Sequence, residues 1–124
     1  MIPTGLVGVK GYLTWDELKD MQKSPYVRIY NHTWSHADLG NSSHDKIDSE
    51  MTMSQNQLET NLGIKPDIMA YPYGSFNDEV EAVIKDHGFI AAFSTIGGLE
   101  QCTSQILELR RIHAGNTSVP PLSF

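Results

Sequence analysis

The sequence predicts an α/β fold built on a largely parallel sheet. Short apolar runs alternate with longer amphipathic segments along the chain, which is the pattern of proteins that alternate strands and helices. Glycine or proline stands at most of the boundaries between these segments. Consecutive strands joined by helices pair in parallel, so we expect ligand-binding residues at the edge where the strands end.

In the first half of the chain, the expected elements are a strand, a helix, a strand and a helix. In chain order they cover residues 6–9, 15–22, 27–30 and 43–61. Thr14 and Glu17 have the spacing of a capping box and predict the start of the first helix. Gly63 is the expected C-cap of the second helix. The core stripe of that helix is expected to be Ile47, Met51, Leu58 and Leu62.

The second half continues the alternation. Strands are predicted over 67–71, 89–94 and 106–112, and a helix that buries Val80, Val83 and Ile84 is predicted between Asn77 and Gly88. Gly97 and Gly98 are expected to form a turn. Cys102, the single cysteine, rules out an intrachain disulfide framework and is expected to be a small buried or half-buried residue.

Length and charge narrow the classes of function. A chain of 124 residues suffices for one compact domain, and its net charge of -6 argues against nucleic acid or an anionic membrane as the main partner. That charge fits a neutral or cationic ligand such as a polysaccharide. No run reaches the ~18 apolar residues of a membrane span, and the first residues lack the features of a signal peptide.

The first candidate site is the pair His32 and His36. Two imidazoles four residues apart can face the same side of a turn, and each can offer a ring nitrogen to one ion at ~2.0–2.1 Å. Imidazole suits zinc, iron, cobalt and nickel. The alternative is a histidine that caps a turn beside an unrelated partner. The position of the pair directly after a predicted strand favours a metal site.

The second candidate is the segment Tyr71-Pro72-Tyr73-Gly74, which follows the strand predicted over 67–71. Proline fixes φ, and glycine allows a conformation that other residues avoid, so a rigid bend with free backbone N–H groups and two displayed aromatic rings is expected. Such N–H groups can form an oxyanion hole, and tyrosine rings suit the apolar faces of sugars. The alternative is an ordinary strand-to-helix turn.

The third candidate is His113, which lies just past the end of the last predicted strand. A general acid can occupy such a position. The alternative is a solvated or capping histidine.

Taken in order, these segments resemble the polysaccharide deacetylase (NodB homology) family, which includes chitin, peptidoglycan and poly-N-acetylglucosamine deacetylases. Residues 32–39 resemble its H-[ST]-x-x-H metal motif, and residues 70–74 resemble its third motif, in the A-Y-P-Y-G form of the poly-N-acetylglucosamine branch. Residues 86–94 and 109–112 match two further passages of the family. The resemblance implies a partial, distorted (β/α) barrel.

The resemblance also implies a hydrolase that removes N-acetyl groups from N-acetylglucosamine-containing polysaccharide, with a divalent metal. By its motifs, His32 and His36 are metal ligands, and the Tyr73 N–H stabilises the tetrahedral oxyanion. Tyr71 and Pro72, together with Tyr73, shape the sugar pocket. Zinc is the expected metal, with cobalt, nickel and iron as alternatives, and the expected partner is a polysaccharide or oligosaccharide.

The chain departs from the family pattern chiefly at its first motif, and it also lacks the upstream histidine that serves as general acid in the poly-N-acetylglucosamine branch. The family's first motif, T-F-D-D, supplies the catalytic base and the third metal ligand, and this sequence contains no Asp-Asp pair. We therefore expect residues 1–124 to be a single deacetylase domain that is truncated at its N-terminus, with His113 as a substitute general acid. An inactive homologue, which acts as a carbohydrate-binding or structural domain with a residual metal site, is the alternative.

Two further expectations follow from the resemblance and the truncation. An exposed sheet edge favours a homo-oligomer. The full-length protein is expected to be extracellular or at the cell surface, although without a signal peptide in this chain a cytoplasmic location stays open.

Overall fold

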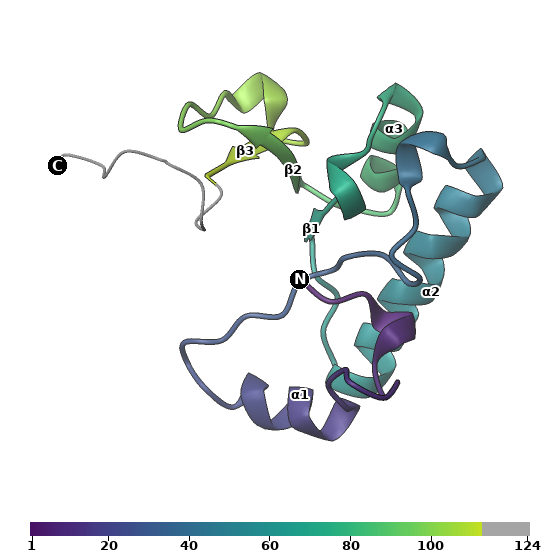
Figure 1. The fold of residues 1–124 in the computed structure, drawn as a ribbon, viewed down its shortest axis with the longest axis vertical. Helices are drawn as coiled ribbons and strands as arrows, with labels where there is room; N and C mark the ends of the chain where they lie inside the picture. The colour runs from purple at the N-terminus through teal and green to yellow at the C-terminus, as the bar shows by residue number, and fades with distance from the viewer. Residues whose placement is uncertain (113–124) are drawn as a thin grey trace, which may run out of the picture.

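A computed structural model describes residues 1–112 and places a three-stranded parallel sheet at the centre of the molecule (Figure 1). The strands follow the order β1 (Ile68–Ala70), β2 (Ala91–Gly97) and β3 (Leu109–Arg111). Single bridges extend the sheet beyond β1, from Met69 to Asn31 and from Asn31 to Ile2. The expected parallel sheet is confirmed, and both predicted site segments lie next to β1.

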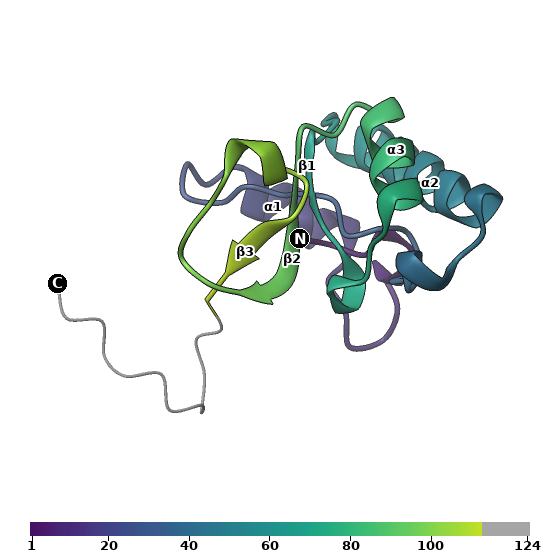
Figure 2. The ribbon, with the colours of Figure 1, turned by 90° about the horizontal axis from the view of Figure 1, so that it is seen from above.

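Three helices accompany the sheet, namely α1 (Trp15–Gln22), α2 (His44–Leu62) and α3 (Asp78–Asp86). Helices α2 and α3 lie on the same side of the sheet, while α1 lies at the far end of the molecule from β3 (Figures 1 and 2). No helix of residues 1–112 has the length and apolar character needed to cross a membrane.

The ends of the helices follow the expected chemistry. The capping box of α1 is present, because the N–H of Thr14 donates to Glu17 Oε2 at 2.7 Å and the N–H of Glu17 donates to Thr14 Oγ1 at 3.3 Å. Asn77 caps α3 by accepting from the N–H of Val80 at 3.0 Å. Gly63 ends α2 at a φ of 66°, in the left-handed region.

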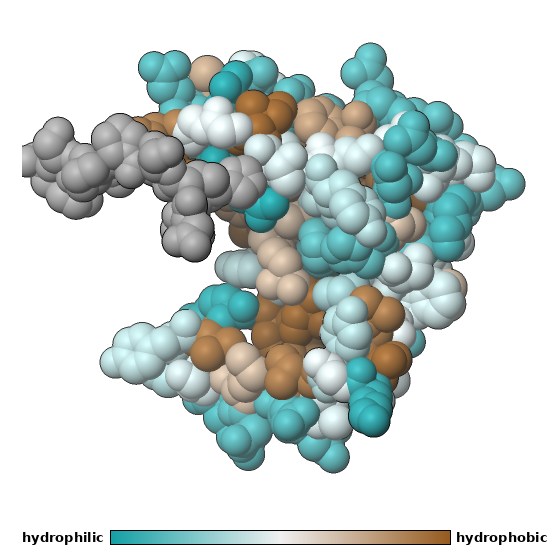
Figure 3. Space-filling view, in the orientation of Figure 1, coloured by the Kyte–Doolittle hydropathy of each residue, from teal (hydrophilic) through white to brown (hydrophobic). Residues whose placement is uncertain are grey.

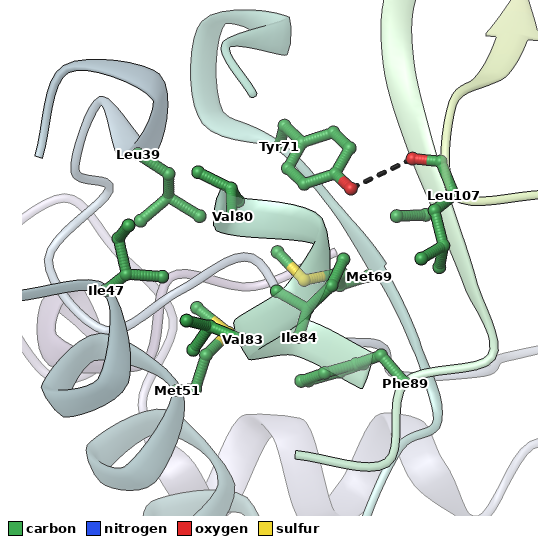
Figure 4. Packing of buried hydrophobic residues seen from close by; sticks show 11 residues of the cluster. Leu39, Ile47, Met51, Met69, Tyr71, Val80, Val83, Ile84, Phe89 and Leu107 are labelled. Atoms are coloured by element: carbon green, nitrogen blue, oxygen red, sulfur yellow. Dashed lines mark hydrogen bonds between the residues drawn. The ribbon is translucent and has the colours of Figure 1, made fainter. Parts of the chain in front are cut away.

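The main core lies between the sheet and the helices α2 and α3 (Figure 4). The four residues expected as the stripe of α2 are all buried. Burial of each such side chain contributes roughly 1.5–3 kcal/mol to the free energy of unfolding, relative to the same side chain left exposed. The main cluster consists of Leu39, Ile47, Met51, Met69, Tyr71, Val80, Val83, Ile84, Phe89, Ala92 and Leu107. A second cluster, which carries α1, consists of Leu18, Ile29, Leu58 and Leu62.

Two predicted strands in the first half are wrong. Residues 4–6 form a short 3₁₀ helix, and the chain then turns at Gly8, whose φ of 83° is incompatible with an extended strand. The N–H of Gly8 donates to the carbonyl of Leu13 at 2.9 Å, within a local loop. Residues 27–30 form no strand, since the only bridges nearby are those of Asn31.

The last part of the described chain also differs from prediction. Strand β2 continues through Gly97, where a turn was expected, and β3 covers only 109–111 of the predicted 106–112. Cys102 is exposed rather than buried, because it lies in the connection from β2 to β3 just before a 3₁₀ helix over Thr103–Gln105, whose residues are themselves exposed.

The face shown in Figure 3 is hollowed between the strands β2 and β3 and the segment that carries α1. Apolar side chains gather on the α1 side of this notch. Helices α2 and α3 therefore cover one side of the sheet, and no helix of residues 1–112 covers the other.

Candidate metal and catalytic site

The predicted histidine pair and Tyr73 line one open cavity of about 450 Å³. Neither Tyr71 nor Pro72 reaches its lining. The cavity thus unites residues that lie about forty positions apart, on the segment after Asn31 and on the bend after β1. Its lining residues are Pro3, Leu6, Tyr12, His32, Ser35, His36 and Tyr73.

His32 is held in one tautomer by the backbone. Its Nδ1 lies 2.7 Å from the carbonyl oxygen of Ala70, the last residue of β1. A carbonyl only accepts, so Nδ1 carries the proton and Nε2 keeps its lone pair. Burial lowers the pKa of His32, the Ala70 hydrogen bond acts in the opposite direction, and the neighbouring His36 lowers it further. The neutral imidazole, which is the metal-binding form, is therefore favoured.

His36 lies beside His32, with the ring centroids 4.8 Å apart and the rings nearly perpendicular. The ring of Tyr73 contacts His36 at the same centroid separation. His36 and Thr33 both have left-handed backbone conformations, at φ values of 63° and 66°. Such conformations are unfavourable for non-glycine residues and persist only where surrounding contacts hold them.

Those contacts come in part from buried polar side chains. Asn31 Oδ1 accepts from the N–H of Thr33 at 2.8 Å, and Asn31 Nδ2 donates to Ser54 Oγ on α2 at 2.8 Å. Thr33 Oγ1 accepts from the N–H of His36 at 3.0 Å. The histidine pair is therefore tied to α2 as well as to β1.

Glu50 is a residue of the site that the sequence-based prediction missed. Its side chain is fully buried, and its carboxylate accepts from the N–H groups of Trp34 and Ser35, which lie between the two histidines. The sequence feature that could have identified Glu50 is its position on the buried face of α2, three residues after Ile47 and four before the buried Ser54. A carboxylate on a buried face has to be paired.

The stability of the protein should depend on the ionisation of Glu50. Burial raises the pKa of its carboxyl, but hydrogen bonds from Lys46 and Ser35 outweigh burial and hold the pKa below the ordinary value of 4.5. A carboxyl whose pKa is lower in the folded state than in the unfolded state stabilises the fold when it is ionised. This stabilisation is complete above the pKa of the unfolded state and is lost as the pH falls through the pKa of the folded state. Between pH 7 and pH 3, we expect the free energy of unfolding, measured with urea, to fall less for Glu50→Gln than for the wild type. Parallel pH profiles would contradict this prediction.

The segment 71–74 forms the expected bend. Tyr73 and Gly74 have left-handed φ values of 58° and 69°, and Pro72 is buried beneath them. The neighbouring N–H groups of Gly74 and Ser75 are bonded to carbonyls, whereas within residues 1–112 the N–H of Tyr73 has no such partner. Tyr73 is 68% exposed. Within residues 1–112, the bend therefore offers one backbone N–H that is not bonded to a carbonyl, on a residue that lines the cavity.

Two displayed tyrosine rings were expected, and that expectation is wrong for Tyr71. Its ring is buried and stacks on Phe76, with the centroids 4.9 Å apart, and its hydroxyl donates to the carbonyl of Leu107 at 2.9 Å (Figure 4). Burial raises the pKa of Tyr71, so the hydroxyl stays protonated as a donor. Tyr71 supports the bend from within the core.

Removal of the Tyr71 hydroxyl should lower stability. Tyr71→Phe leaves the Leu107 carbonyl without its partner, which costs about 1–3 kcal/mol when a buried acceptor stays unsatisfied. Urea unfolding measures the loss. Tyr26→Phe is the matched control, since Tyr26 is 94% exposed, and it should unfold like the wild type. Equal stability of the two variants would contradict the assignment.

The described side chains provide only part of a metal-binding site. The described residues offer two imidazoles with access to one cavity, but within residues 1–112 no cluster of three or more histidine, cysteine, aspartate or glutamate side chains is placed to hold an ion. Asp38, the acidic residue nearest to the pair in sequence, accepts instead from Asn41 Nδ2 at 2.9 Å. His113, the expected general acid, lies outside the described residues.

Comparison with known proteins gives one consistent result. The family model for polysaccharide deacetylases matches residues 4–92. A chitin deacetylase from Pestalotiopsis sp. is 39% identical over 72 residues, which are 58% of this chain and 20% of that protein. Chitin deacetylase 1 from Cryptococcus neoformans is 32% identical over 72 residues, which are 56% of this chain and 15% of that protein.

A solved structure agrees with the sequence matches. The deacetylase PplD from Streptococcus pyogenes, in complex with acetate, superposes with a TM-score of 0.83 at 28% identity. The superposition covers 89% of this chain and 49% of PplD. The chain therefore spans about half of that enzyme and less of the two chitin deacetylases.

Proposed function

The chain belongs to the polysaccharide deacetylase family, and on this premise we propose that it acts as a metal-dependent hydrolase of N-acetyl groups on N-acetylglucosamine-containing polysaccharide. The observation that carries the proposal is the shared cavity. It brings the histidine pair, with the free Nε2 of His32, to the same space as Tyr73.

The proposed reaction consumes one water and yields acetate and a free amine on the sugar. A divalent ion, with zinc as the first choice, supplies Lewis acidity toward the acetamide carbonyl and a water when it is bound. His32 and His36 hold that ion. The free N–H of Tyr73 donates to the oxygen that becomes negative as the carbonyl carbon turns tetrahedral. His113 is proposed as the acid that protonates the leaving amine.

The substrate side of the cavity is proposed to recognise a sugar ring. Tyr73 offers an exposed aromatic face beside His36, and Pro72 and Tyr71 fix the bend that carries it. The net charge of -6 suits a product that gains a positive amine.

A non-catalytic carbohydrate-binding homologue is the second candidate. It is favoured by one observation, that residues 1–112 bring two and not three metal-ligating side chains together. Such a protein would bind the sugar through Tyr73 and leave the acetyl group in place.

Acetate release from chito-oligomers, measured on the zinc-loaded protein, tests the proposed function. O-acetylated xylo-oligomers serve as the comparison substrate, because they carry esters instead of acetamides. We expect release from the chito-oligomers, and a strong loss of release in His36→Ala, which removes one of the two proposed metal ligands. Release from the ester substrate alone would contradict the N-deacetylase assignment. Binding of chito-oligomers without release would support the second candidate.

A further inference from the structure

We propose that Glu50 is a positioning residue, whose buried carboxylate holds the loop 33–36 in the conformation that brings His32 and His36 together. This inference rests on the proposed function, in which the two histidines share one ion. Glu50 itself does not line the cavity, so any effect it has on the metal acts through the loop.

The contacts of Glu50 fall on the residues between the two histidines. Oε2 accepts from the N–H of Trp34 at 2.9 Å and from the N–H of Ser35 at 2.7 Å. Oε1 accepts from Ser35 Oγ at 2.6 Å and from Lys46 Nζ at 2.7 Å. All four partners are donors, which an ionised carboxylate can satisfy and a buried hydrocarbon cannot.

The opposite side of the loop is fixed by the N-terminal segment. The N–H of Thr4 donates to the carbonyl of Thr33 at 3.1 Å, and the N–H of Gly5 donates to the carbonyl of Trp34 at 2.7 Å. A Cβ on Gly5 would lie 2.8 Å from that same carbonyl, so the two segments are in close contact. The carbonyls of the loop are thus held on one side, and its N–H groups are held by Glu50 on the other.

This arrangement explains how the loop keeps its unfavourable backbone. Thr33 and His36 stand on either side of the two N–H groups that Glu50 binds, and both have positive φ. Without the carboxylate, the N–H groups of Trp34 and Ser35 would lose their partner, and rotation of the backbone there would move His36 relative to His32. Lys46 is the cation that faces the carboxylate, and its Nζ also lies 5.8 Å from the centroid of the Trp34 ring.

Three variants of the full chain separate positioning from general destabilisation. Glu50→Ala removes both oxygens. Glu50→Gln keeps one acceptor for the two N–H groups and places an NH2 donor beside Ser35 Oγ, while the side chain of Lys46, which is 45% exposed, can turn to solvent. Glu59→Ala is the matched control, an exposed glutamate of the same helix whose side chain has no hydrogen-bond or ion-pair partner within residues 1–112. Two readouts are compared, namely amide hydrogen exchange in the metal-free protein and the affinity for Co²⁺ from its visible absorption.

We expect Glu50→Ala to speed exchange at Trp34 and Ser35 by ten-fold or more relative to the amides of α3, and to weaken Co²⁺ binding by ~10–100-fold. Glu50→Gln should restore most of both values, and Glu59→Ala should match the wild type. Equal behaviour of Glu50→Ala and Glu59→Ala would overturn the proposal, as would faster exchange spread evenly over the protein. If the wild type binds no Co²⁺, the proposed function fails, and local exchange still decides the role of Glu50.

Discussion

Replacement of His32 by alanine is expected to weaken zinc or cobalt binding at least about 100-fold. His32 presents Nε2 to the cavity because the Ala70 carbonyl fixes Nδ1 as a donor, and burial favours the neutral ring. Loss of one of two imidazole ligands leaves His36 with water, which binds a divalent ion far more weakly than a chelating pair. Isothermal titration of the metal-free protein with Zn²⁺ measures the change.

A second histidine on the surface provides the control for this loss. His87 lies at the end of α3, where its Nε2 pairs with Asp48 at 2.8 Å, and it does not line the cavity of the histidine pair. His87→Ala should therefore bind Zn²⁺ like the wild type. Equal affinity of His32→Ala and His87→Ala would show that the metal, if bound, uses other ligands.

Gly74→Ala is expected to lower stability by about 3 kcal/mol and to abolish acetate release. Its φ of 69° is strained for alanine, and the added Cβ would overlap the side chain of Thr95 on β2. Backbone strain and overpacking each cost roughly 1–3 kcal/mol. To relieve the overlap, the bend has to move away from β2, which displaces the adjacent N–H of Tyr73.

Gly88→Ala separates strain from overlap. Gly88 also has a positive φ, of 85°, but a Cβ there meets no atom of the described chain within 4 Å. The free energy of unfolding of this variant, measured with urea, should fall only by the cost of the backbone strain, about 1 kcal/mol, and its acetate release should be kept. If Gly74→Ala were no less stable than Gly88→Ala, close contact between the bend and Thr95 would be ruled out as the cause of the loss.

The features that could be predicted from sequence are those fixed by neighbours along the chain. The capping box at Thr14, the C-cap at Gly63 and the buried stripe of α2 depend on residues within one or two turns, and all three are confirmed. The apolar run 6–9 failed as a strand because the local bonds of Gly8 favour a loop, and apolar character alone does not distinguish the two.

In the candidate site, too, the features set by nearby residues could be predicted from the sequence, and those set by distant residues could not. The spacing of His32 and His36 was visible in the sequence, but the hydrogen bond that sets the tautomer of His32 joins residues 38 positions apart. Tyr71 belongs to a motif that suggests an exposed ring, yet its hydroxyl finds a partner 36 residues away in the core. Such pairings depend on how β1, β2 and the segments beside them come together, which local patterns do not encode.

Acetate release from chito-oligomers before and after metal removal tests whether the site at His32 and His36 is metal-dependent. The protein is stripped with a chelator, assayed, and assayed again after addition of one equivalent of Zn²⁺, with His32→Ala treated in parallel. We expect the wild type to lose its activity on stripping and to regain it with zinc, while His32→Ala stays inactive throughout. Release that persists in the stripped protein, or that His32→Ala retains in full, would contradict a metal-dependent site at His32 and His36.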